Sequence, residues 1–290
     1  MAISWSLDPL LHHTLSKVLC EQILGDLKVT QVALLSGLLL SVCYPFMHKM
    51  LLKIFKAYRA INPACKQIVV LHHAMEALVL SFLTPIFTNS MLRAFFQIHD
   101  IDAVVYDIRM CAHLSVMIMF MYFMEIAARY ESPRILVLFH HILACGDGIM
   151  VMWCATSVMV KTGAVLVYFI CFEALTFAGL FMYRVCAENK YTSKVIFLGM
   201  IIFGITRPLQ VLVIGGIAYG SWNDETQENW QIIFQSAVTL VLSILQLFTL
   251  KIHYAVWKKV TLISERIPGK LDTVGNKNQE EYDEEFQGNK

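Results

Sequence analysis

Long apolar stretches separated by short polar segments dominate the pattern of this chain. A helix needs about 20 apolar residues to cross the roughly 30 Å hydrocarbon core of a bilayer, and stretches of this length recur along most of the sequence. The predicted spans are 29–52, 67–92, 108–129, 134–160, 162–186, 194–221 and 229–257. The pattern therefore predicts an all-α integral membrane protein with about seven transmembrane helices.

The division between the fourth and fifth spans depends on three residues. Lys161, Thr162 and Gly163 interrupt a nearly continuous apolar run from Ile135 to Tyr183. At about 1.5 Å per residue, a single helix of that length would be much longer than the bilayer is thick. We therefore expect the chain to turn at these three residues.

The composition agrees with a membrane protein and excludes other classes. Hydrophobic residues make up 57% of the chain and charged residues 16%, which is outside the range of soluble domains. The net charge of +1, without a basic stripe, excludes nucleic acid as a partner and leaves membrane lipids as the expected partners. The eight cysteines are scattered without a CxxC pair, so no disulfide framework is predicted.

Lysine and arginine residues are distributed unevenly between alternate connections. Seventeen of the 23 fall on one predicted side of the membrane and five on the other, and Arg207 lies inside the sixth span. Because positive residues accumulate on the cytoplasmic side, we expect a lumenal N-terminus and a cytosolic C-terminus.

Four parts of the chain follow from these features. They are a lumenal N-terminal segment (1–28), a first transmembrane helix with a basic cytosolic loop (29–60), a six-helix membrane domain (61–260) and an acidic cytosolic tail (261–290). The tail is rich in acidic and amide residues and too poor in apolar ones to form a core, so it is predicted to be disordered.

Ionisable residues inside the predicted spans are the main functional signal. A charged group at bilayer depth is costly and usually faces a partner or a cavity within the bundle. Five consecutive spans carry such residues, which is hard to reconcile with a simple anchor. They are His72, His73, Glu76, His113, Glu125, His140, His141, Asp147, Glu173 and Arg207.

Spacing indicates which of these residues can meet. Glu76 follows His73 by three residues and His72 by four, so either histidine can reach it on one helix face. Asp147 lies between two glycines, where a local helix break would let its carboxylate reach a ligand. Arg207 needs a counter-ion, for which Glu173, Glu125 or an anionic lipid head group is expected.

Four segments resemble the TLC-domain family, which includes ceramide synthases and translocon-associated membrane proteins. They are LHHAMEALVLS (71–81), MYFMEIAARYESPRILVLFHH (121–141), FEALTFAGL (172–180) and FGITRPLQ (203–210). The resemblance covers roughly residues 65–255. It implies a barrel-like bundle of six helices around a lipid-sized cavity, preceded by one helix, in the endoplasmic reticulum. It also implies a protein that binds or regulates membrane lipids, in sphingolipid metabolism or lipid homeostasis.

An acyltransferase of ceramide-synthase type is the first alternative. His140 and His141 match the family's histidine pair, but the chain continues without the His-Asp-x-x-Asp element that follows the pair in ceramide synthases. In this alternative, His140 or His141 acts as general base or acyl acceptor, oriented by Asp147. Acyl-CoA is then a co-substrate, no cofactor is expected, and the other ionisable residues hold the lipid.

Other functions are less well supported by the sequence. A metal-dependent membrane lipid hydroxylase or hydrolase needs clustered histidine ligands, and neither an HxxHH nor an HxxxH box occurs, so no residue is assigned to a metal. A seven-helix receptor or a transporter would also fit the number of spans. Neither the DRY-like nor the NPxxY-like element of receptors occurs, and no internal repeat points to a transporter.

Overall fold

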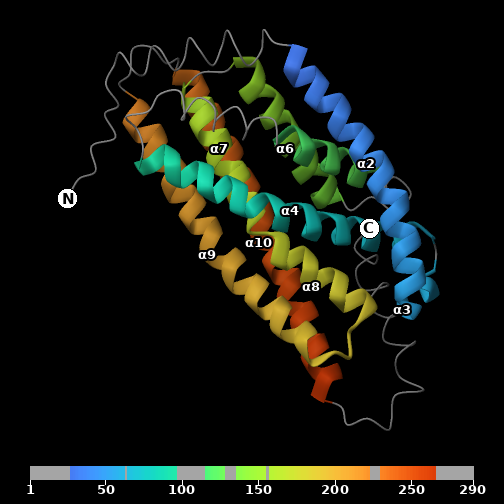
Figure 1. The fold of residues 1–290 in the computed structure, drawn as a ribbon. Coiled ribbons are helices and arrows are strands. Elements are labelled where there is room, and N and C mark those ends of the chain that lie inside the picture. The colour runs from blue at the N-terminus through green and yellow to red at the C-terminus, as the bar shows by residue number, and fades with distance from the viewer. Residues whose placement is uncertain are drawn as a thin grey trace.

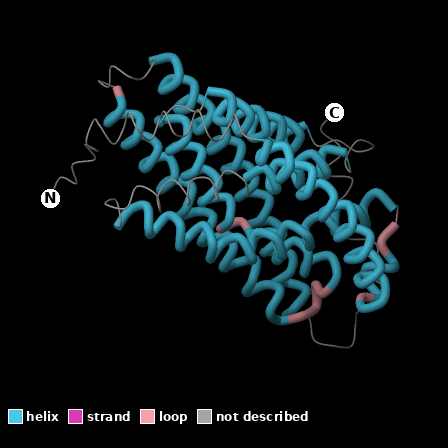
Figure 2. The backbone as a smooth tube through the Cα atoms, turned by 45° about the horizontal axis from the view of Figure 1, so that its top comes forward, coloured by secondary structure: helices cyan, strands magenta, loops and turns pink. Residues whose placement is uncertain are grey.

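The structure is a computed structural model, which describes residues 27–62, 64–96, 115–127, 135–154, 157–222 and 229–265. Every regular element in this part of the chain is a helix, and no strand occurs in it (Figure 2). The predicted all-α class is therefore confirmed. Residues 1–26 of the N-terminal segment, His113 and residues 266–290 of the acidic tail lie outside the described residues.

The described residues form nine helices in chain order. They are α2 (Leu27–Ile54), α3 (Lys56–Ala60), α4 (Ala64–Phe96), an unlabelled helix (Ser115–Ala127), α6 (Ile135–Cys154), α7 (Ser157–Cys171), α8 (Ala174–Val185), α9 (Lys190–Ser221) and α10 (Asn229–Glu265). Helix α10 thus continues beyond residue 260, where the predicted tail begins.

Five segments of the described chain are long and apolar enough to cross a membrane, which fits an integral membrane protein. They are Ala33–Ile54, Ala64–Asn89, Lys161–Val185, Tyr191–Ser221 and Asn229–Ile263. Two shorter apolar helices, Ser115–Ala127 and Ile135–Val151, fall within the third and fourth predicted spans. The count of seven crossings and the TLC-type barrel stay predictions.

The helices form a bundle with an apolar outer surface. Figure 1 shows α2 and α9 along opposite edges, α4 crossing between them, and α9 beside α10. The outer face of α2 exposes large apolar side chains, with Leu34 at 65%, Val42 at 69% and Phe46 at 68%. An apolar outer surface of this kind suits contact with lipid tails.

The predicted turn at Lys161, Thr162 and Gly163 is wrong, because these residues lie inside α7. The hydroxyl of Thr162 donates to the carbonyl of Val158 at 2.8 Å, so this polar side chain is satisfied within its own helix. At Gly163 a Cβ atom would lie 3.0 Å from Val151 Cγ1, and the missing side chain allows α7 to pack closely on α6. Both residues serve helix formation and packing rather than a turn.

The fifth predicted span is divided in two by a turn at Phe172 and Glu173. The Glu173 N–H donates to the carbonyl of Ile170 at 2.9 Å, which tightens the end of α7. The carbonyl of Cys171 accepts a hydrogen bond from the Thr84 hydroxyl of α4 at 3.2 Å. Irregular backbone is tolerated at membrane depth when neighbouring side chains satisfy it, and here the turn places Glu173 in the interior.

Glycines allow the close approach of α8 and α9. A Cβ atom on Gly179 would lie 2.9 Å from Ile196 Cγ1, and one on Gly199 would lie 3.2 Å from the Thr176 backbone nitrogen. Small residues at such contacts are typical of helix pairs packed in membranes. These contacts fix α9 against α8, whose N-cap residue is Glu173.

The basic connection after α2 contains the short helix α3. Tyr58 is fully buried there, its hydroxyl lies 2.8 Å from His48 Nδ1, and the hydroxyl also donates to the Gln67 carbonyl at 3.2 Å. Burial raises the pKa of Tyr58 to about 12, so the hydroxyl keeps its proton. Lys53 and Arg59 are exposed around this anchor.

Candidate functional site

Helix α4 brings His72, His73 and Glu76 together on neighbouring positions of one face. The Nε2 atom of His72 lies 3.3 Å from Glu76 Oε1, and the Nδ1 atom of His73 lies 3.4 Å from Glu76 Oε2. The meeting predicted from their spacing is therefore confirmed. Each carboxylate oxygen of Glu76 faces a different imidazole.

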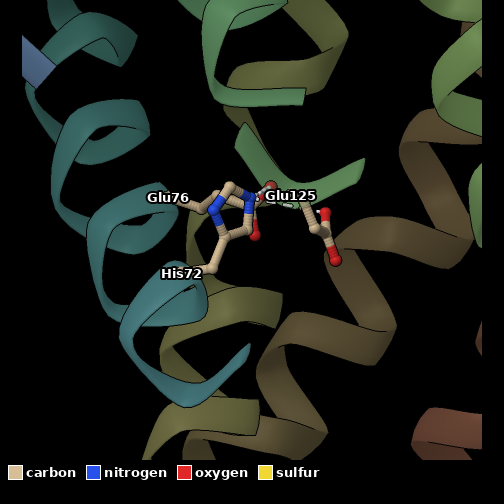
Figure 3. Close-up of side chains that lie close together, drawn as sticks. All are labelled: His72, Glu76 and Glu125. Atoms are coloured by element: carbon tan, nitrogen blue, oxygen red, sulfur yellow. Dashed lines mark ion pairs between the residues drawn. The ribbon is translucent and has the colours of Figure 1, made fainter. Parts of the chain in front are cut away.

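A second carboxylate reaches the same histidine from another helix. Glu125, on Ser115–Ala127, places Oε2 at 3.4 Å from His72 Nε2 (Figure 3). His72 thus lies between two carboxylates, and the exposed fractions are 0% for His72, 1% for Glu76 and 2% for Glu125. Two acidic groups this deeply buried need positive charge or protons close by.

Helix α6 adds His141 to this group. Its Nε2 atom lies 2.5 Å from Glu125 Oε2, its ring stacks on Tyr122 with centroids 4.4 Å apart, and its Nδ1 atom has no hydrogen-bond partner among the described residues. The neighbouring His140 is only partly buried and meets the edge of the Tyr122 ring. Of the predicted pair, His141 is the residue directed at the carboxylates.

The four residues His72, Glu76, Glu125 and His141 are called the His–Glu cluster below. Tyr44 of α2 extends the cluster, because its hydroxyl lies 2.5 Å from His72 Nδ1. Tyr44 was not among the residues predicted from the sequence. Its polar hydroxyl within the first predicted span was the available signal.

Asp147 does not contact either histidine of the pair. Its Oδ1 atom accepts a hydrogen bond from Gln235 Nε2 of α10 at 2.8 Å. The local break expected at its flanking glycines is also wrong, because α6 is continuous from Ile135 to Cys154. Gly148 instead admits the side chain of Met119, whose sulfur would lie 2.8 Å from an added Cβ atom. Glu125, not Asp147, is the carboxylate in contact with His141.

Arg207 pairs with Glu173, one of the three counter-ions predicted for it. The guanidinium donates to Glu173 Oε1 and, through Nη1, to Gln210 Oε1 at 2.6 Å. Gln246 Nε2 of α10 also donates to Glu173 Oε1 at 3.3 Å, and the guanidinium carbon lies 4.6 Å from the centre of the Phe203 ring. The positive charge of the buried Arg207 guanidinium is therefore balanced by the Glu173 carboxylate within the protein.

A stripe of polar residues follows the buried face of α10 and was missed in the sequence. All five members are less than a tenth exposed, and each has a side-chain oxygen without a hydrogen-bond partner among the described residues. The spacing of three or four residues in an apolar span was the signal that could have revealed it. The α10 stripe consists of Gln231, Gln235, Thr239, Ser243 and Gln246.

Comparison with known proteins gives no relative, because no protein-family model, curated protein or solved structure matches this chain. The fold and the site therefore define only a broad class of membrane protein. In the described residues, helices of membrane-spanning length enclose buried ionisable and polar side chains.

Proposed function

We propose that this protein is a multi-pass membrane protein of TLC-domain type that binds a membrane lipid inside its helix bundle. In this proposal the lipid's polar head group occupies the interior beside the His–Glu cluster and the α10 stripe. The endoplasmic reticulum is the proposed location, and lipid homeostasis or sphingolipid metabolism the proposed role.

One observation carries the proposal: each residue of the α10 stripe has a buried side-chain oxygen without a hydrogen-bond partner among the described residues. A buried polar group without a hydrogen bond costs roughly 1–3 kcal/mol, and several along one helix would be a large cost. A head group that accepts and donates hydrogen bonds would offset this cost. The apolar tails of the same molecule would match the surrounding helices.

Lipid mass spectrometry of the detergent-purified protein tests the proposal. We expect a lipid to co-purify with the wild type, and less of it with the double variant Gln235→Leu/Thr239→Val, which replaces stripe residues by apolar side chains of similar size. The control is Ile233→Leu, an exposed position of the same helix. Equal lipid content in all three proteins, or none in the wild type, would contradict the proposal.

Acyl transfer is a second candidate, favoured by the contact between His141 and Glu125. A proton on Nε2 would be donated to Glu125, so the Nδ1 lone pair would be available as base or nucleophile. In such a reaction Nδ1 attacks the thioester carbonyl, the carbon–sulfur bond breaks and coenzyme A leaves as the thiolate, which takes up the proton that the amine releases in the next step. The amine of a long-chain base then takes the acyl group from the imidazole.

The matched pair His141→Gln and His140→Gln tests acyl transfer. Purified protein is incubated with mixed acyl-CoA and long-chain bases, and acylated product is measured by mass spectrometry. We expect product to disappear in His141→Gln and to persist in His140→Gln, because only His141 contacts Glu125. Absence of product in the wild type would contradict acyl transfer, and lipid binding would stay as the one proposed function.

A further inference from the structure

We propose that His72, Glu76 and Glu125 form a binding site for a divalent transition-metal ion, with Zn²⁺ as the best fit. His72 Nε2 and a carboxylate oxygen from each glutamate all lie within 4.8 Å of one another, in the interior of the bundle (Figure 3). No metal ligand was predicted from the sequence, where only histidine pairs were considered. The proposal stands independently of lipid binding.

Two ligand atoms of the site lack hydrogen bonds although they are completely enclosed. His72 Nε2 and Glu76 Oε1 have no hydrogen-bond partner among the described residues, and the two side chains are 0% and 1% exposed. Buried polar atoms are normally satisfied, and here the nitrogen and the oxygen face one another at 3.3 Å as an ion-pair contact without good hydrogen-bond geometry, an arrangement that an ion bound between them would satisfy. A metal ion accepts both lone pairs at once.

The distances between the ligand atoms match a tetrahedral ion. Zinc binds imidazole nitrogen and carboxylate oxygen at about 2.0–2.2 Å, so two ligand atoms on one tetrahedral ion lie about 3.3–3.6 Å apart. His72 Nε2 lies 3.3 Å from Glu76 Oε1 and 3.4 Å from Glu125 Oε2. Two of the three ligand-atom distances therefore match tetrahedral coordination, and the carboxylate oxygens of Glu76 and Glu125 lie within 4.8 Å of one another.

The neighbouring groups provide the outer hydrogen bonds that metal ligands commonly have. Tyr44 lies 2.5 Å from His72 Nδ1, and a proton on Nδ1 would leave the Nε2 lone pair for the metal. His141 lies 2.5 Å from Glu125 Oε2, and His73 lies 3.4 Å from Glu76 Oε2, so both carboxylates are oriented as well. At 2.5 Å from Glu125, His141 is too close to share the ion as a ligand.

Charge balance favours the same conclusion. Two carboxylates and a neutral imidazole carry two negative charges, which a divalent cation neutralises in a region where uncompensated charge is costly. Three protein ligands would leave the fourth tetrahedral position open, as in catalytic zinc sites. Water or an oxygen of a bound lipid would complete the coordination.

Metal content of the purified protein tests the site. The full chain, carried on an affinity tag without histidine, is purified without chelator and analysed by inductively coupled plasma mass spectrometry. We expect about one transition-metal ion per chain in the wild type and a loss of at least about tenfold in Glu76→Gln and Glu125→Gln. Asp147→Asn is the matched control, because its buried carboxylate bonds Gln235 outside the site and should leave the metal in place.

Two further measurements test the metal site even where the glutamate variants fold poorly. Metal-depleted wild type is titrated with Co²⁺, and four-coordinate binding is expected to give visible d–d absorption that Zn²⁺ abolishes. Tyr44→Phe, which removes one hydroxyl, should weaken Zn²⁺ binding by roughly 10–100-fold without removing a ligand. Three results would overturn the proposal: a wild type that binds neither ion, a metal content in Glu76→Gln and Glu125→Gln equal to that of the wild type, or an amine-bearing lipid at the carboxylates in place of metal.

Discussion

The ion pair between Arg207 and Glu173 shows what one buried residue does in this protein. Replacing Glu173 by Gln leaves the guanidinium, 2% exposed, without its opposite charge. Breaking a buried pair by removing one partner costs about 3–5 kcal/mol, so we expect Glu173→Gln to lower the free energy of unfolding by that amount. Denaturation of the purified protein with sodium dodecyl sulfate measures it.

The double variant Glu173→Gln/Arg207→Met completes this test. Because it removes both charges, its cost should be smaller than the sum of the two single costs. Glu188→Gln is the control, since Glu188 is exposed after α8 and its removal should change stability by less than about 0.5 kcal/mol. Additive single costs would show that Arg207 and Glu173 are not coupled.

Residue spacing predicted contacts within a helix but not between helices. His72 and Glu76 were paired correctly because a helix fixes the distance between positions four apart. Glu125 and His141 are 16 residues apart in the sequence, and Tyr44 and His72 are 28 apart. No local rule brings such residues together, so the cluster required the packing of α2, α4, Ser115–Ala127 and α6.

At the scale of helices, hydropathy located the apolar segments but misplaced their ends. It treated Thr162 and Gly163 as an interruption, although Thr162 is satisfied within α7 and Gly163 serves packing on α6. It also passed over the turn at Phe172 and Glu173, which has neither glycine nor proline. Average hydropathy does not register a hydrogen bond to a neighbouring helix, such as the one from Thr84 to Cys171.

The contact between α8 and α9 gives a prediction at the same scale. Gly199→Ala would place a methyl group 3.2 Å from the Thr176 nitrogen, so α8 and α9 must move apart. Overpacking of this kind costs about 1–3 kcal/mol, and we expect a lower thermal unfolding midpoint in detergent. Gly204→Ala is the control on the same helix, because nothing lies within 4 Å of its added Cβ atom.

Gly204→Ala should be neutral or slightly stabilising, since alanine favours a helix over glycine by about 0.5–1 kcal/mol. The two substitutions add the same atom to α9 and differ in what that atom meets. Equal midpoints for the two variants would mean that the close approach at Gly199 does not determine the stability of this helix pair.

At the scale of the whole molecule, the orientation in the membrane is a prediction from the distribution of positive charge. Five or seven crossings are both odd numbers, so either count places the two ends of the chain on opposite sides. The exposed basic residues Lys49, Lys53, Lys56 and Arg59 lie together around the connection between α2 and α4. This group should hold that end of the bundle in the cytosol.

Glycosylation tags on the two ends of the chain test this orientation, because the sequence contains no Asn-x-Ser/Thr acceptor of its own. In microsomes we expect an N-terminal tag to be glycosylated and a C-terminal tag to stay unmodified, as read from the shift in gel mobility after endoglycosidase treatment. Exchanging the four basic residues for Gln should increase the inverted fraction, since they provide the charge that selects the cytosolic side. Modification of both tags would require an even number of crossings, and modification of the C-terminal tag alone would reverse the orientation.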